Sequence, residues 1–180
     1  MRQLQLVAIG EVDPALLDHL RARLVEQFRV KCHVADPLPT PDYALHAERR
    51  QYHSSEILTR ITPHAKDCWR VLAVTSVDLY IPILTFVFGE AQMGGPCAIV
   101  SAHRLRDEFY GLPPNPAMLK ARLLKEAVHE LGHTLHLTHC RDYYCVMASS
   151  HSVEWIDLKE HQLCGDCQNK VLAHHAAGAL

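Results

Sequence analysis

One stretch near the C-terminal end of the sequence, His129–Met147, constrains the fold more than any other part of the chain. His129 and His133 are four positions apart, so on a helix both imidazoles project from nearly the same face and can bind one cation. His139 comes six residues after His133, and a continuing helix would carry it about 9 Å further along the axis. If His139 is to bind the same cation, the helix has to end after His133 and the chain has to turn back.

The residue types in this stretch predict a catalytic zinc site. Three neutral imidazoles occupy three corners of a tetrahedron and leave the fourth to water, which is the coordination of a catalytic zinc and not of a structural one. Zinc lowers the pKa of its water to about 7, and Glu130 can act as the general base when this water attacks a carbonyl carbon. The competing interpretation is a chance set of polar residues on an exposed helix face. The third histidine, His139, and a methionine eight residues later, Met147, disfavour it.

Four of the seven cysteines lie close to this stretch, and they predict a second metal site. Cys140, Cys145, Cys164 and Cys167 can form a closed tetrahedral thiolate cage around a structural zinc. Because Cys140 adjoins His139, fixing the thiolates would also fix the third histidine. The alternative is four reduced thiols in an ordinary core.

Hydrophobic patterning predicts an α/β domain. A β-α-β unit opens the chain, with Asp13 as the cap of its helix, and its two strands should be parallel. Asn115 is expected to cap the helix that carries His129 and His133. Strands are predicted at residues 4–9, 30–34, 70–76 and 97–101, and helices at residues 14–28, 48–62, 116–135, 153–158 and 163–171.

The long motif resembles the signature of the metzincin clan of zinc peptidases, His-Glu-x-x-His-x-x-Gly-x-x-His followed by a methionine turn. More narrowly, the chain resembles the archaemetzincins. That family places a cysteine directly after the third histidine, another five residues on, a methionine two residues later, and then Cys-x-x-Cys. The matching residues are Cys140, Cys145, Met147, Cys164 and Cys167. The resemblance implies that Met147 is the turn residue, an apolar floor beneath the metal.

The resemblance also implies an architecture and a substrate-binding edge. We expect a metzincin-like zincin fold with a mixed, mostly parallel twisted sheet and an active-site helix. The chain should form one metallopeptidase domain, with a sheet and helix subdomain at residues 1–135 and a small zinc-stapled subdomain at residues 136–180. In the clan, a short antiparallel edge strand binds the extended peptide. Here it falls at Phe86, Gly89 and Ala91, and a bare edge strand is the alternative.

The chain departs from the clan pattern at His136, which stands where the clan has glycine. The backbone there is expected to need a positive φ, at a cost of about 1–2 kcal/mol for a non-glycine residue. His136 could compete as a metal ligand, but we expect it to cap the helix or to face solvent.

Composition narrows the possible partners and the compartment. A formal net charge of -2 without a run of lysine or arginine argues against a nucleic-acid partner. No apolar run approaches the roughly 20 residues of a membrane span, and the N-terminus does not read as a signal peptide. We therefore expect a cytoplasmic monomer that does not bind membranes.

Together these observations predict a zinc-dependent peptidase that acts on a peptide or protein substrate and binds two zinc ions, one catalytic and one structural. The alternative is a zinc-binding protein without peptidase activity, either a pseudo-enzyme misaligned by His136 or a structural interaction module.

Overall fold

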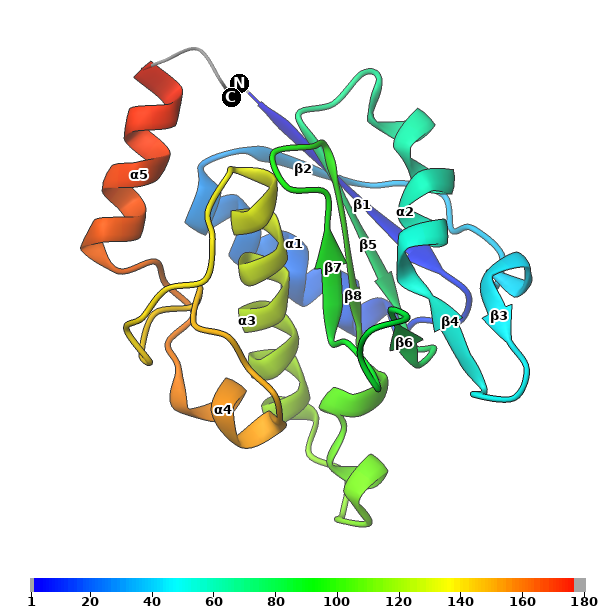
Figure 1. Cartoon of the computed structure of the whole chain (residues 1–180). Helices are drawn as coiled ribbons and strands as arrows, with labels where there is room; N and C mark the ends of the chain where they lie inside the picture. Colours follow the sequence, from blue (N-terminus) through cyan, green and yellow to red (C-terminus); the bar gives the residue numbers. More distant parts are fainter. Residues whose placement is uncertain (1, 177–180) are drawn as a thin grey trace.

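The computed structural model describes residues 2–176 of the chain (Figure 1). Its strands are β1 (Gln3–Ile9), β2 (Lys31–Val34), β3 (Leu45–His46), β4 (Gln51–His53), β5 (Arg70–Thr75), β6 (Leu79–Tyr80), β7 (Gly89–Ala91) and β8 (Cys97–Ser101). Its helices are α1 (Pro14–Phe28), α2 (Ser54–Ile61), α3 (Pro116–Thr134), α4 (Val153–Leu158) and α5 (Gly165–Ala176).

The main sheet has the strand order β2-β1-β5-β8-β7. Its first four strands run parallel, and β7 pairs antiparallel with β8 at the edge. Side chains alternate between the two faces of the sheet, so Leu6 packs with α1 and α3 whereas Val7 packs with α2. The domain therefore has three layers, with the sheet in the middle (Figure 1). The expected α/β class with a mixed, mostly parallel sheet is confirmed.

The two long helices begin where the sequence predicts. The Asp13 side chain accepts a hydrogen bond of 2.8 Å from the Ala15 amide at the start of α1. The Asn115 side chain accepts one of 3.1 Å from the Met118 amide at the start of α3. In both helices a proline follows the cap, where its missing N–H costs nothing. The register of α3, and hence of its histidines, is fixed from this end.

The helix predicted at residues 48–62 is wrong in its first part. The structure places a strand, β4, before α2, in a second sheet with the order β3-β4-β6. The side-chain amide of Gln51, through Nε2, donates to Asp78 Oδ2 at 3.0 Å and to the Thr85 carbonyl at 2.9 Å. These contacts come from residues far along the chain, so no local pattern could indicate them.

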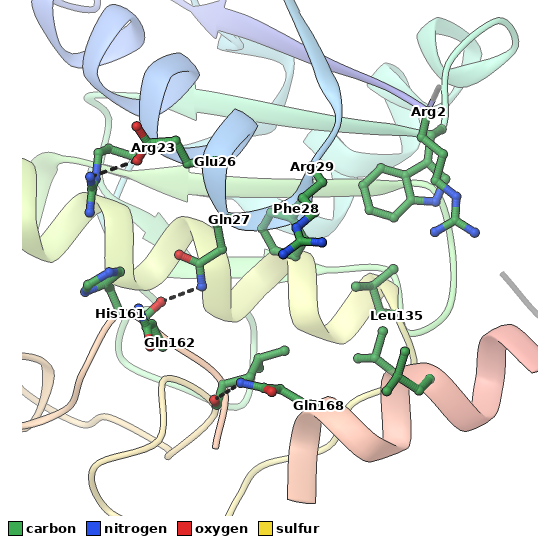
Figure 2. A pocket seen from close by; sticks show the side chains of 14 residues that line it. Arg2, Arg23, Glu26, Gln27, Phe28, Arg29, Leu135, His161, Gln162 and Gln168 are labelled. Atoms are coloured by element: carbon green, nitrogen blue, oxygen red, sulfur yellow. Dashed lines mark hydrogen bonds and ion pairs between the residues drawn. The ribbon is translucent and has the colours of Figure 1, made fainter. Parts of the chain in front are cut away.

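After α3 the chain runs back beside that helix to α4, which packs on it, and then continues to α5 (Figure 1). The Gln27 side chain of α1 donates to the carbonyl of His161 at 2.8 Å and so holds this segment to the first helix (Figure 2). The same region encloses a hollow of about 640 Å³ between α1, Trp69 and α5. None of the candidate metal ligands, all of which lie in the described part of the chain, lines it.

No helix within residues 2–176 is both long enough and apolar enough to cross a membrane.

Candidate metal centres

Two histidines of α3 point into one cleft. His129 Nδ1 donates to the Val146 carbonyl at 2.8 Å, and His133 Nδ1 donates to the Leu137 carbonyl at 2.7 Å. Because a carbonyl oxygen can only accept, each Nδ1 carries the hydrogen and each Nε2 keeps its lone pair. The two Nε2 atoms lie 3.1 Å apart. Both imidazoles therefore turn their acceptor nitrogens toward the same point.

The turn after α3 brings the third histidine back to this point. The helix ends at Thr134, and His136 has a φ of 64°, which matches the expectation of a left-handed conformation at this position. The His136 ring lies against Gly94, where an added Cβ would come within 2.1 Å of the ring. The ring of His139 then lies with its centroid 5.3 Å from that of His129 and 5.1 Å from that of His133.

The three imidazoles fit a zinc ion. One ring nitrogen from each of His129, His133 and His139 lies within 4.8 Å of the others, and His136 is not part of this group. Burial is the largest cause that lowers the pKa of all three rings, so they are neutral near pH 7, as zinc ligands must be. Zn–N bonds of 2.0–2.1 Å at tetrahedral angles separate two ligand nitrogens by about 3.3 Å. The observed 3.1 Å between two Nε2 acceptors is close to this value.

Glu130 lies in the same cleft and is only 6% exposed. Burial, reinforced by the charge of Glu126, raises the pKa of the Glu130 carboxyl well above its usual value, and Lys159 opposes this shift. Gly89 makes room for the side chain, because a Cβ there would lie 2.7 Å from Glu130 Cγ and 2.6 Å from the carbonyl oxygen of Ile99. A side chain on β7 at this position would collide with Glu130.

The cleft has a volume of about 710 Å³. Phe86, Gly89 and Ala91, the three substrate-binding candidates, all line it. Gly89 and Ala91 belong to β7, whose other edge carries no strand among the described residues, and Phe86 lies in the segment that precedes it. Ser149 and His151, which follow the predicted methionine turn, also line the cleft.

Met147 is fully buried against α3. A Cβ at Gly132 would lie 2.4 Å from the Met147 sulfur, so the glycine between Glu130 and His133 gives the thioether its place. The Cys140 amide donates to the Met147 carbonyl at 2.9 Å, which closes the loop from Cys140 to Met147 directly after His139. The Met147 side chain therefore packs on α3 at Gly132, and its role as the turn residue beneath the metal stays a prediction.

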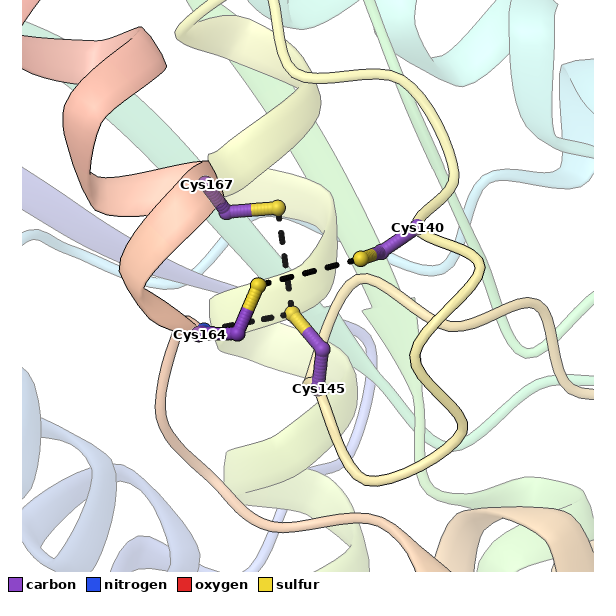
Figure 3. A group of neighbouring side chains, drawn as sticks. All are labelled: Cys140, Cys145, Cys164 and Cys167. Carbon is purple, nitrogen blue, oxygen red and sulfur yellow. Dashed lines mark hydrogen bonds between the residues drawn. The ribbon is translucent and has the colours of Figure 1, made fainter.

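The four predicted cysteines also converge, and Figure 3 shows their sulfur atoms turned toward one another. Cys140 Sγ lies 3.8 Å from Cys164 Sγ, and Cys145 Sγ lies 3.8 Å from Cys167 Sγ. A disulfide would need about 2.0 Å, and all four thiols are free. Zn–S bonds of 2.3 Å at tetrahedral angles give an S–S separation of about 3.8 Å. The cage thus has the dimensions of a thiolate zinc site.

Sequence reasoning missed two charged residues beside the cleft, Glu126 and Lys159. Glu126 comes four positions before Glu130, so their shared helix face could have pointed to it. Lys159 follows α4 in an irregular segment, and no local signal indicates that it is buried.

Comparisons with known proteins agree with this geometry. The model of peptidase family M54 matches residues 43–173. The archaemetzincin of Methanocaldococcus jannaschii is 44% identical over 163 residues, which cover 91% of this chain and 89% of the relative. The solved archaemetzincin structure from Methanopyrus kandleri has a TM-score of 0.85 and 34% identity, and the match covers 97% of this chain and 96% of that one. A zinc-dependent peptidase structure from Methanocorpusculum labreanum also has a TM-score of 0.85, with 28% identity, and covers 93% of this chain and 99% of that one.

Proposed function

The chain belongs to peptidase family M54, the archaemetzincins, and we therefore propose that His129, His133 and His139 hold the catalytic zinc of a metallopeptidase. The observation that carries the proposal is the convergence of three neutral imidazoles in one cleft with a buried carboxyl group, Glu130. The Val146 and Leu137 carbonyls support it, because they turn both Nε2 lone pairs toward one point.

Glu130 is the general base, and then the general acid, of the proposed reaction. Zinc, when bound, supplies a Lewis acid that polarises the peptide carbonyl and makes water more acidic. Glu130 takes a proton from the attacking water as its oxygen bonds to the carbonyl carbon. The carboxyl group then gives that proton to the amide nitrogen as the C–N bond breaks, so the products are an acid and an amine. Gly89 keeps β7 clear of this side chain.

The substrate is a peptide in extended conformation that lies along the free edge of β7. The edge position of β7 and its place on the wall of the cleft support this assignment. Backbone groups of Gly89 and Ala91 would bind the main chain of the peptide, and Phe86 would contact its side chains. Each of these residues belongs to the cleft that holds the histidines.

A second, structural zinc is held by Cys140, Cys145, Cys164 and Cys167. The two S–S distances of 3.8 Å and the absence of a disulfide among these residues support it. We interpret residues 136–180, of which the structure describes those up to 176, as a small subdomain that this zinc staples together, because all four cysteines belong to it; residues 1–135 form the sheet and helix subdomain. Each chain would then bind two zinc ions.

The test is Glu130→Gln in the zinc-loaded protein. We expect the variant to keep two zinc ions per chain, measured by mass spectrometry of the metal, and to lose at least about a thousandfold in kcat/KM on a peptide selected from a library digest. Glu108→Gln, at an exposed position outside the cleft, is the matched control and should cleave at the wild-type rate. Equal turnover by wild type and Glu130→Gln would remove Glu130 from the reaction. A zinc-loaded wild type that cleaves nothing would favour a zinc-binding protein without activity.

A further inference from the structure

Lys159 is one of the largest fully buried side chains, and the reaction proposed above does not use it. The residue is 1% exposed, whereas lysine is almost never fully buried unless it is paired. Taking an ammonium group out of water is costly, and an excellent partner has to compensate for it. The contacts of this group therefore call for a physical explanation.

The Lys159 ammonium joins two segments that carry the candidate catalytic site. Its Nζ lies 2.9 Å from Glu126 Oε1 on α3, and it donates to the Ala148 carbonyl at 3.2 Å. Glu126 Oε1 accepts no hydrogen bond of good geometry from the described residues. The contact between Lys159 and Glu126 is therefore an ion pair without hydrogen-bond geometry. The side chains of both ions are nearly inaccessible, at 0% and 5% exposure.

Each end of this bridge lies next to residues of the site. Glu126 is one helical turn before Glu130 and lines the same cleft. Ala148 directly follows Met147, and it comes two residues after Val146, whose carbonyl orients His129. Lys159 therefore ties the turn at residues 146–148 to the helix that carries the proposed base and the first ligand.

We propose that Lys159 is a positioning residue for the peptidase reaction, acting by holding the turn at residues 146–148 against α3 through its contacts with Glu126 and Ala148. The inference rests on the proposed roles of His129 and Glu130. Loss of either member of the ion pair releases the turn, and the Val146 carbonyl then no longer fixes the His129 ring. Outer partners of this kind change metal affinity or activity by about 10–100-fold when they are removed.

The same helix offers a matched control. The Arg122 side chain is 7% exposed, pairs with Asp107 at 2.6 Å and with Asp157 at 2.8 Å, and so joins α3 to α4. It is a comparably buried cation at the same interface, one helical turn from Glu126. Neither Asp107 nor Asp157 lies in a segment that contains a proposed site residue. Replacing Arg122 should therefore lower stability without moving the turn at residues 146–148.

The experiment compares Lys159→Met, Glu126→Gln, the double variant and Arg122→Met as zinc-loaded full-length proteins. We expect kcat/KM on a cleaved peptide to fall by about 10–100-fold in both single variants, mainly through kcat. The kcat/KM of the double variant should lie within about threefold of that of the less active single variant, because both changes break the same contact. Hydrogen exchange of residues 145–150 should accelerate by at least about tenfold in these three proteins. Arg122→Met should lower the melting temperature while kcat/KM and the local exchange stay within about threefold of wild type.

Unchanged kcat/KM and unchanged exchange in Lys159→Met would overturn the proposal, and so would an equal loss in Arg122→Met. If Lys159→Met does not fold, Glu126→Gln, which keeps the cation and the shape of its partner, gives the same test. If hydrogen exchange accelerates in the variants but the zinc-loaded wild type cleaves no peptide, the contact of Lys159 with the turn is upheld and the proposed function is refuted.

Discussion

Replacing Gly89 by alanine tests the placement of Glu130 more sharply than replacing Glu130 itself. The new Cβ would lie 2.6 Å from the Ile99 carbonyl oxygen and 2.7 Å from Glu130 Cγ, whereas an ordinary contact begins at 3.4 Å. The nearest neighbour is backbone of β8 and cannot simply rotate away, so β7 has to move by about 0.8 Å relative to β8, and Glu130 has to yield by about 0.7 Å if it is to keep an ordinary contact.

A shift of this size has a calculable effect on the reaction. Misplacing a reacting group by about 1 Å can cost about a hundredfold in rate, so we expect kcat/KM to fall by about 10–100-fold. Overpacking of this kind costs about 1–3 kcal/mol, which lowers the melting temperature by roughly 2–12 °C in a domain of this size. The zinc content should not change, because the three atoms nearest the added carbon belong to Ile99 and Glu130 and not to a histidine.

The assay measures kcat and KM on a fluorogenic peptide at a temperature well below the melting transition, together with zinc per chain. Gly165→Ala is the control, because a Cβ at that glycine meets nothing within 4 Å. A Gly89→Ala enzyme with kcat/KM within threefold of wild type would refute the reasoning. It would show that neither β7 nor Glu130 is held as tightly as the close approach requires.

Three further changes test the metal sites separately. His139→Ala should leave one zinc per chain, in the cysteine cage, and abolish cleavage, and metal analysis with a peptide assay checks both. Cys164→Ser should lower the melting temperature by about 10 °C or more, because the cage contributes folding energy, and a chelator should have a similar effect on the wild type. His136→Gly relieves about 1–2 kcal/mol of backbone strain but adds about 0.5–1 kcal/mol of unfolding entropy, so its melting temperature should rise by no more than about 6 °C. Two zinc ions per chain and retained cleavage in His136→Gly would agree with the exclusion of His136 from the ligands, and loss of a zinc ion would contradict it.

Much of the fold could be predicted because its signals are local. Asn115 and Pro116 mark the start of α3, and apolar residues at helical spacing mark its buried face. The short strands β4 and β6 have three and two residues and owe their place to each other and to Asp78, so no periodic pattern announces them. For this reason the helix predicted at residues 48–62 wrongly included the residues of β4.

The same distinction between local and tertiary signals decides which features of the candidate site could be predicted. The spacing of the histidines and cysteines along the chain indicated both groups of candidate ligands, and a glycine position filled by His136 indicated the left-handed turn. The tie between Glu126 and Lys159 could not be predicted, because the two residues are 33 positions apart and meet only after α4 has packed on α3. The room that Gly94 leaves for the His136 ring is likewise a tertiary feature.

Consecutive residues of this chain serve two different groups of ligands, since the imidazole of His139 faces one and the thiol of Cys140 faces the other. With a single peptide unit between them, we expect zinc in one group to restrict the conformations open to the other, which would link the two proposed binding equilibria thermodynamically. Zinc uptake should therefore be cooperative, and saturation of either group should tighten the other by the same factor.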